Sequence, residues 1–298
     1  MRWAPALLAA VLIGTAACSD QAANTGTPDP RWSAMVATLS GPFDPSSANV
    51  CNRGDTGCIP IVEAEMQRRL APLARTCSHE APFALMYLRV TEAVARSGRG
   101  QFANPSYIAH LDALFARSYF IATDNWVGGH RDRVPEAWRI AFQAADDRTV
   151  SGIGDMLLGM NAHISRDLPF AVAAAWPELS QAAGRKADFD RVNSILTQVQ
   201  GPLTAEAARR WDPTIATFRI PDLGQTDGIG TIIGRWRNEA WNNGKRLAGA
   251  KDARDRARIA ADIESTAANR ALLIRAATGY LDLRSDPGVR DRYCRGST

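Results

Sequence analysis

Helical periodicity is the feature that most restricts the fold of this 298-residue chain. Nearly every long segment repeats its apolar residues at intervals of three and four, the spacing that places them on one face of an α-helix. No alternating run rich in β-branched residues is long enough to form a sheet. The sequence therefore predicts an all-α fold, a single domain of packed and mostly antiparallel helices.

Proline and glycine mark where these helices begin and end. Asn104 before Pro105 and Asp29 before Pro30 each offer a side-chain acceptor to the free amides of a helix start, where proline loses no helical hydrogen bond. The periodic segments are 30–39, 61–73, 82–96, 105–123, 135–145, 150–176, 189–210, 230–247 and 253–278.

The N-terminus reads as an export signal. Arg2 supplies a positive charge, and the apolar run 4–17 has the length of a signal peptide but is too short to span a bilayer. The run ends in GTAAC, which resembles the lipobox of bacterial lipoproteins, in which the cysteine is lipidated. Thr15 stands where the lipobox usually has leucine, so ordinary cleavage after Ala17 is the alternative. We expect a lipid on Cys18.

These signals divide the chain into three parts. Residues 1–17 are the expected signal peptide, 18–30 the lipidated cysteine with a flexible tether of small polar residues, and 31–298 the helical domain. The protein is then exported and held at the membrane of the bacterial cell envelope by its lipid. A 46% hydrophobic content over about 280 mature residues suffices for one sizeable core. The net charge of +4 is small and dispersed, which argues against nucleic acid as a partner.

Cysteine parity supports lipidation independently. Of five cysteines, lipidation of Cys18 leaves an even set of four for disulfides. The short CNRGDTGC segment favours a local bridge between Cys51 and Cys58, which leaves Cys77 to pair with Cys294. The alternative is that Cys77 or Cys294 is a buried free thiol.

His163 and Asp167 form the main candidate site. They lie four residues apart in an apolar helical segment and would share one helix face. The two could ligate one divalent metal ion, or the carboxylate could orient the imidazole as a base. Asn161 lies about 200° from His163 around an ideal helix and joins the site only if the helix is distorted. Pro169 favours distortion, because it removes a helical hydrogen bond and clashes with the carbonyl of the residue four before it.

An alternative interpretation makes this segment structural, with Asp167 capping a second helix and His163 part of the core. A site would need further carboxylates from other helices, and Asp112 is the first choice, followed by Asp124 and Asp190. The other histidines, His79, His110 and His130, are expected at the surface or in the core rather than as ligands. The sequence contains no P-loop, H-E-x-x-H, G-x-G-x-x-G or G-x-S-x-G motif.

Five segments of the chain resemble DUF5995, an uncharacterised bacterial family. The resemblance covers roughly residues 81–250, implies a helical domain, and marks Asn161, His163 and Asp167 as the functional cluster, but it implies no activity. The segments are LDALFARSY from Leu111, PEAWRIAF from Pro135, LLGMNAHISRDL from Leu157, FDRVNSIL from Phe189 and NEAW from Asn238.

Three functions fit these features. The first is an envelope-anchored lipoprotein that acts as a ligand-binding or accessory module, with a polar pocket around His163 and Asp167 for a small molecule or lipid. The second is a metal-dependent hydrolase, loosely similar to zinc phospholipases C, although the other histidines of those enzymes are missing here. The third is a purely structural envelope protein.

Overall fold

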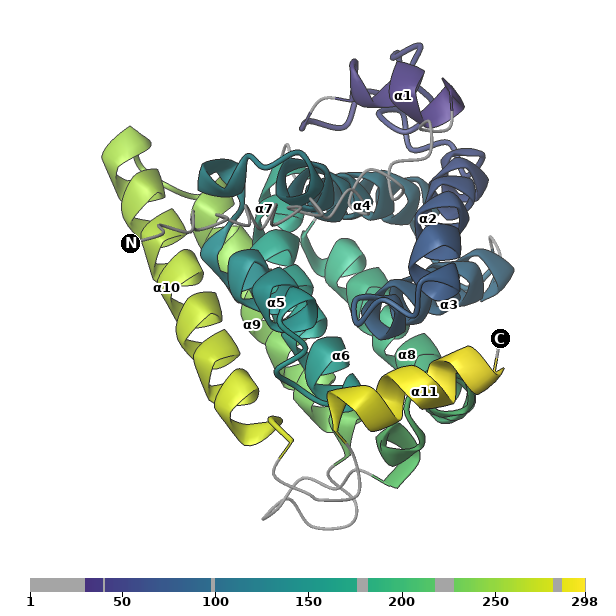
Figure 1. Ribbon diagram of the computed structural model, residues 1–298. Coiled ribbons are helices and arrows are strands. Elements are labelled where there is room, and N and C mark those ends of the chain that lie inside the picture. Colours follow the sequence, from purple (N-terminus) through teal and green to yellow (C-terminus); the bar gives the residue numbers. More distant parts are fainter. Residues whose placement is uncertain are drawn as a thin grey trace, which may run out of the picture.

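The computed structural model describes residues 30–39, 41–97, 100–175, 182–217, 228–280 and 286–297, and over these ranges the fold is all-α, as the periodicity predicts (Figure 1). An isolated bridge between Val150 and Gly279 is the one β-type pairing in the described ranges. The signal peptide, Cys18 and the tether lie outside them. The α-helices are α1 (Pro30–Val36), α2 (Cys58–Arg75), α3 (Ala81–Ser97), α4 (Pro105–Val127), α5 (Glu136–Asp146), α6 (Gly152–Met160), α7 (Leu168–Ala174), α8 (Ala182–Arg210), α9 (Ile229–Ala248), α10 (Ala253–Ala277) and α11 (Pro287–Ser297).

The helix between α6 and α7 is the centre of the fold. Residues Asn161–Asp167 form a wide π-helical segment, η3, that joins α6 to α7 without a break. This segment contacts α4, α5, α9 and α10, so it is enclosed by helices from both halves of the chain. In Figure 1, α9 and α10 lie along one side, and α2 and α3 lie on the other.

Close helix packing depends on glycine at one crossing in particular. A Cβ atom on Gly244 of α9 would lie 2.5 Å from Cγ1 of Val172 on α7. Only a residue without a side chain lets the two helices approach this closely. The extensive contact between α7 and α9 therefore rests on this position.

Two features of the fold differ from the sequence-based expectation. The side chain of Asn104 does not cap α4; instead its backbone N–H and its amide donate to the carboxylate of Asp188 on α8, at 2.6 and 3.2 Å. The C-terminal helix α11 was not predicted, because its short, arginine-rich sequence has little apolar periodicity. Asp29, the second expected cap, lies outside the described residues.

Both expected disulfides are present. Cys51 bonds to Cys58, and Cys77 bonds to Cys294, a sequence separation of 217 residues. The second bond fixes α11 to the loop between α2 and α3, where it lies across the ends of other helices (Figure 1). Within the described residues, no helix combines the length and the apolar character that a membrane span requires.

Candidate functional site

The π-helical turn places His163 and Asp167 in direct contact. The N–H of Leu168 bonds to the carbonyl oxygen of His163, five residues back, where an α-helix would use the residue four back. Pro169 follows at once and cannot donate to the carbonyl of Ser165, which explains why the turn widens here. The distortion predicted from the proline is confirmed.

Asp167 is held by three donors. Its carboxylate accepts from Nε1 of Trp138 at 2.8 Å, from Nδ1 of His163 at 3.1 Å and from Nη1 of Arg166 at 3.0 Å. The side chain is fully buried and makes no capping hydrogen bond to α7. The capping interpretation of Asp167 is therefore wrong. A buried carboxylate with this many donors, one of them a guanidinium, is stable in its charged form.

His163 lies in an aromatic cage. Its ring stacks on Phe115 with a centroid distance of 3.4 Å and contacts Tyr87 at 4.3 Å, while Phe83 and Trp138 approach from other sides at 6.0 Å. Burial lowers the pKa of His163, against the raising effect of Asp167. With Nδ1 donating to Asp167, the neutral imidazole presents Nε2 as an acceptor, and this atom has no partner among the described residues.

The space beside Gly159, one turn before His163, is occupied by the aromatic ring of Phe83. A Cβ atom there would lie 2.3 Å from Cγ of Phe83. Asn161 points elsewhere: its side-chain amide donates to the carbonyl of Ala267 on α10 at 2.8 Å. Asn161 therefore connects the π turn to α10, and its side-chain amide is directed to Ala267 rather than to His163.

Asp112 and Tyr87 extend the cluster away from His163. Asp112 lies three residues before Phe115 on α4, so both are on the face that packs towards His163. Burial and the negative charge of Glu63 raise the pKa of Asp112 to about 7. Burial and the charges of Asp112 and Asp167 raise the pKa of Tyr87 well above its usual value. The pKa of Tyr87 therefore depends on the charges of both Asp112 and Asp167.

The other expected carboxylates lie elsewhere. Asp124 is mostly exposed and pairs with Arg69, and Asp190 pairs with Lys186 on its own helix. Over the described ranges, no group of three or more His, Cys, Asp and Glu side chains is arranged to hold a metal ion. The described residues thus offer His163 and Asp167 no third metal ligand of these types.

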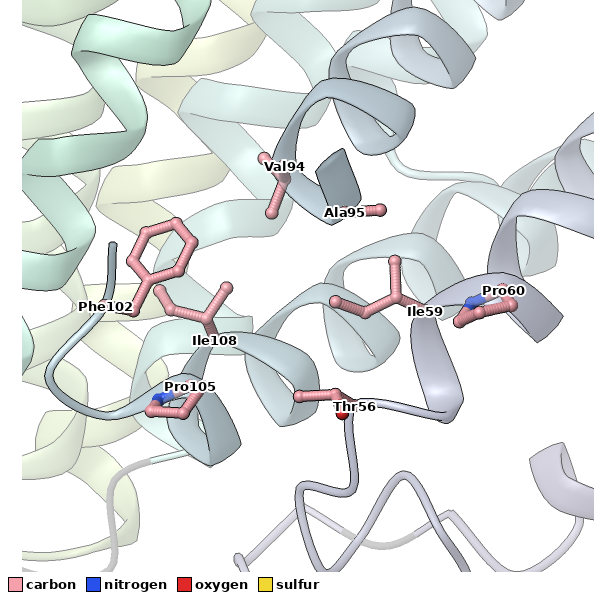
Figure 2. A pocket seen from close by; sticks show the side chains of 8 residues that line it. All are labelled: Thr56, Ile59, Pro60, Val94, Ala95, Phe102, Pro105 and Ile108. Atoms are coloured by element: carbon pink, nitrogen blue, oxygen red, sulfur yellow. The ribbon is translucent and has the colours of Figure 1, made fainter. Parts of the chain in front are cut away.

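An apolar cavity of about 220 Å³ lies between α2, α3 and α4 (Figure 2). Figure 2 shows Val94 and Ala95 of α3 on one side of the space and Ile59 and Ile108 on the other. We call this cavity the α2–α4 pocket. It is lined by Thr56, Ile59, Pro60, Val94, Ala95, Phe102, Pro105 and Ile108.

Polar residues lie one helix turn away from the lining of the pocket. Glu63 lies four residues after Ile59, Asp112 four after Ile108, and Thr91 three before Val94, so each shares a face with a lining residue. Tyr87 lies one further turn along α3, next to His163. We call Glu63, Thr91, Asp112 and Tyr87 the inner polar row.

The inner polar row contains unsatisfied groups. Oγ1 of Thr91, Oδ2 of Asp112 and the hydroxyl of Tyr87 are buried without a hydrogen-bond partner among the described residues, as is Nε2 of His163. Buried polar atoms are nearly always hydrogen-bonded, and water or a bound molecule is the usual partner where no protein group serves. Asp112 and His163 were predicted from the sequence as candidate site residues, whereas Tyr87 and Thr91 were not. Their spacing of four, in an otherwise apolar stripe of α3, was the available signal.

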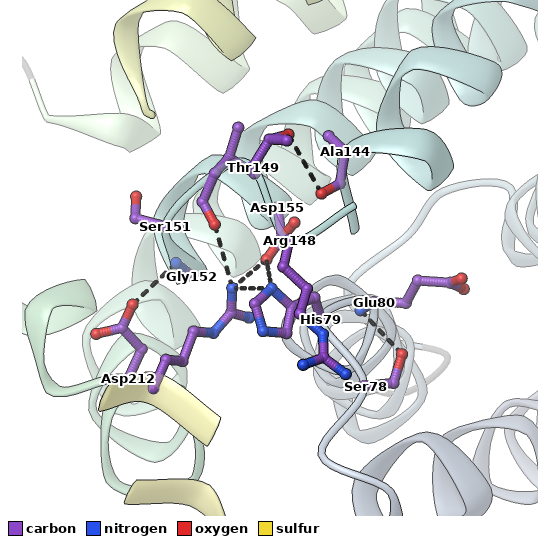
Figure 3. A network of polar contacts seen from close by, with 12 residues as sticks. Ser78, His79, Glu80, Ala144, Arg148, Thr149, Ser151, Gly152, Asp155 and Asp212 are labelled. Atoms are coloured by element: carbon purple, nitrogen blue, oxygen red, sulfur yellow. Dashed lines mark hydrogen bonds and ion pairs between the residues drawn. The ribbon is translucent and has the colours of Figure 1, made fainter. Parts of the chain in front are cut away.

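A second buried polar network lies where α11 meets the body of the protein (Figure 3). Arg290 of α11 donates to Oδ2 of Asp155 and to Nδ1 of His79, and Asp291 contacts Nε2 of His79 at 3.1 Å. Burial and the charge of Arg290 lower the pKa of His79 to about 4. His79 is a core residue, one of the two places expected for it, and its partners come from a helix that was not predicted.

Comparison with known proteins gives one match. Residues 59–277 match a family described as a family of unknown function, DUF5995. The chain belongs to the DUF5995 family. No curated protein and no solved structure matches it.

The DUF5995 region contains the candidate site except for Thr56 of the pocket lining. It begins at Ile59, a lining residue of the α2–α4 pocket, and includes Asp112, His163 and Asp167. It ends at Ala277, before α11. The polar cluster and all of the pocket lining except Thr56 therefore belong to the family domain, whereas the Arg290 network and both disulfides need residues outside the match.

Replacement of Asp167 by asparagine tests the geometry of the cluster. We expect a loss of about 2–3 kcal/mol in the free energy of unfolding, because an amide NH₂ must face a donor from Trp138, His163 or Arg166. Since Asp167 raises the pKa of His163, the variant should titrate His163 at lower pH, measured by NMR. Asp262→Asn, at an exposed ion pair, is the control and should change stability by less than about 1 kcal/mol. An unchanged His163 titration would contradict the described contact.

Proposed function

We propose that this DUF5995 protein is an envelope-anchored lipoprotein that binds a small amphipathic molecule in the α2–α4 pocket. The apolar part of the ligand lies among Ile59, Val94 and Ile108, which line the cavity. Ligand pockets have a largely apolar lining with a few polar groups, and Thr56 is the polar residue among the lining side chains of this cavity. The single observation that carries the proposal is the apolar cavity of about 220 Å³ that lies between α2, α3 and α4.

The sequence predicted a ligand pocket around His163 and Asp167, but the surroundings of His163 leave too little room for a ligand. The ring is 3% exposed, and the cavity that borders its aromatic cage, lined in part by Phe83, Tyr119 and Trp138, measures about 20 Å³. A volume of this size holds about one water molecule. His163 therefore has no room for a ligand beside it, and the ligand of this proposal lies in the α2–α4 pocket.

Filling the pocket tests the proposal. Ala95 lines the cavity and is only partly buried, so Ala95→Leu should occupy the ligand volume with little effect on folding. We expect the Cys18→Ser chain to bind 1-octanol in isothermal titration calorimetry, and Ala95→Leu to weaken binding at least tenfold. Ala71→Leu, the same change at an exposed position of α2, is the control and should bind normally. Equal binding by the two variants, or no binding of any amphipathic probe, would refute the proposal and leave a structural role.

Removal of the Tyr87 hydroxyl, one of the unsatisfied groups of the inner polar row, should be visible in the free energy of unfolding. Tyr87→Phe deletes a buried oxygen that has no partner among the described residues, so in the absence of ligand its free energy of unfolding should be unchanged or raised by about 1 kcal/mol. The measurement is urea-induced unfolding. Thr123→Val is the contrasting control, because its hydroxyl already bonds to the carbonyl of Tyr119. A loss above about 1 kcal/mol for Tyr87→Phe would show that the hydroxyl has a structural partner.

The anchoring part of the proposal rests on Cys18, which lies outside the described residues. We expect a clickable fatty acid fed to cells to label the wild-type protein and not Cys18→Ser. Fractionation should place the wild type with membranes and release the variant into the soluble fraction. Equal labelling of both chains, or of neither, would contradict lipidation and favour ordinary cleavage after Ala17.

A further inference from the structure

We infer that the turn between α9 and α10 is a basic docking surface that binds the anionic headgroups of phospholipids. Of the fifteen residues in the segment 244–258, six are basic and two are acidic, which gives the segment a net charge of +4, the same as that of the whole chain. We call this segment the basic hairpin. The inference rests on the membrane anchoring in the proposed function and names the surface that the folded domain touches. The basic residues are Lys245, Arg246, Lys251, Arg254, Arg256 and Arg258.

The positive charges of the basic hairpin are accessible. All six basic residues are exposed. Two of them form ion pairs: Arg258 contacts Asp255 at 2.7 Å, and Arg246 contacts Asp262 at 3.0 Å. Exposed ion pairs of this kind contribute little free energy, so an anionic surface can compete for both arginines.

Three cations of the basic hairpin have no such partner. Lys245, Lys251 and Arg254 form no ion pair with another residue in the described ranges. Lys245 lies in the last turn of α9, where the helix dipole favours a cation. Arg254 lies in the first turn of α10, where the dipole disfavours one. Helix stability therefore explains Lys245 but not Arg254, whereas an anionic ligand would be attracted to both.

The basic hairpin and the expected anchor lie at the same end of the molecule. The tether leads from Cys18 into α1, which begins at Pro30. Figure 1 shows α1 and the first turn of α10 at the upper end of the molecule, α1 on the right and α10 on the left. A flexible tether of twelve residues has a root-mean-square reach of roughly 20 Å. A lipid on Cys18 would therefore hold this end of the domain close to the bilayer.

A lipid surface matches the charge and the position of the basic hairpin. Each Lys or Arg close to an anionic bilayer strengthens binding roughly fivefold, and the attraction falls off within a Debye length. The anchor supplies a high effective concentration of headgroups, so a weak contact suffices. Attachment at two points, the lipid and the basic hairpin, also holds the domain in one orientation. We favour phospholipid over nucleic acid because the anchor places the hairpin at a membrane.

Vesicle co-sedimentation of the mature chain tests the inference. A chain that begins at residue 18 and carries Cys18→Ser has neither the lipid nor the signal peptide, so its binding reports on the folded domain. We expect it to bind vesicles made of equal parts phosphatidylglycerol and phosphatidylcholine at least tenfold more tightly than vesicles of phosphatidylcholine alone. Raising the salt from about 0.1 M to about 1 M should release it, because the Debye length falls from about 10 Å to about 3 Å.

Two variants with the same change in net charge locate the surface. In the hairpin variant, Lys245→Gln, Lys251→Gln and Arg254→Gln together should weaken binding to the anionic vesicles at least tenfold. The control variant removes three exposed arginines of α8 and α11 that likewise form no ion pair within the described part of the chain, and it should bind within about twofold of the parent. Its substitutions are Arg209→Gln, Arg292→Gln and Arg295→Gln.

Several results would overturn the inference. Equal binding to both kinds of vesicle, or binding to neither, would contradict a basic lipid contact. Equal losses in the hairpin and control variants would assign the binding to net charge rather than to this surface. Tighter binding of a single-stranded oligonucleotide than of anionic vesicles would make nucleic acid the partner. Octanol binding in the α2–α4 pocket and fatty-acid labelling of Cys18 do not involve the hairpin, so failure of the proposed function is measured separately.

Discussion

Replacing Cys77 and Cys294 with alanine will lower the free energy of unfolding by about 5 kcal/mol. The disulfide joins residues 217 apart, and the chain-entropy treatment of a loop of this length gives a stabilisation of about 5 kcal/mol. Loss of the bond also frees α11, whose Arg290 and Asp291 are buried against the body of the protein. Urea-induced unfolding of the double variant measures the effect.

The short disulfide provides the matched control. Cys51 and Cys58 are separated by seven residues, so their replacement should cost about 2–3 kcal/mol on the same treatment. The long-range bond should therefore contribute clearly more than the local one. A smaller loss for the Cys77 and Cys294 variant than for the Cys51 and Cys58 variant would mean that α11 contributes little to the native state.

Replacing Arg290 with methionine will destabilise the protein by about 3–5 kcal/mol at pH 8, because it leaves the buried carboxylate of Asp155 without its cation. Arg290 is 2% exposed, and its guanidinium also donates to His79 and to the carbonyl of Val150. Arg295→Met is the matched control on the exposed face of the same helix and should change stability by less than about 0.5 kcal/mol.

The loss caused by Arg290→Met should be smaller at pH 5.5 than at pH 8. Burial already raises the pKa of Asp155 to about 7 although Arg290 lowers it, so removal of the arginine raises this pKa further. An acid whose folded-state pKa lies above its unfolded value binds more protons when folded, so its contribution to stability falls as the pH rises towards the folded-state pKa. At pH 5.5 Asp155 is therefore protonated and needs no cation.

His79 works in the same direction. Arg290 lowers the pKa of His79, and a histidine whose folded-state pKa lies below its unfolded value destabilises the fold as the pH falls below about 6.5. Without Arg290 this loss at low pH is reduced. Adding Asp155→Asn to Arg290→Met should restore part of the stability at pH 8. A loss that is independent of pH, or equal to that of Arg295→Met, would contradict the described ion pair.

The local features of this protein followed from its sequence. The periodic segments became helices, with ends shifted by a few residues, because apolar spacing decides which face can be buried. His163 and Asp167 meet because residues four apart share a helix face, and Pro169 widens the turn between them. The disulfide pairing followed from cysteine parity and from the short spacing of Cys51 and Cys58.

The tertiary structure alone decided which of these features act together. Asp188 takes the place of the predicted Asn104 cap, and Arg290 enters the core from a helix with little apolar periodicity. Tyr87, on α3, joins Asp112 of α4 to His163 of the π turn. Spacing along a helix fixes which residues share a face, but which faces meet depends on how the helices pack. For this reason the sequence determined the His163 and Asp167 pair, and only the packing of the helices surrounded His163 with the rings of Phe115, Tyr87 and Trp138 and formed an apolar pocket between α2, α3 and α4.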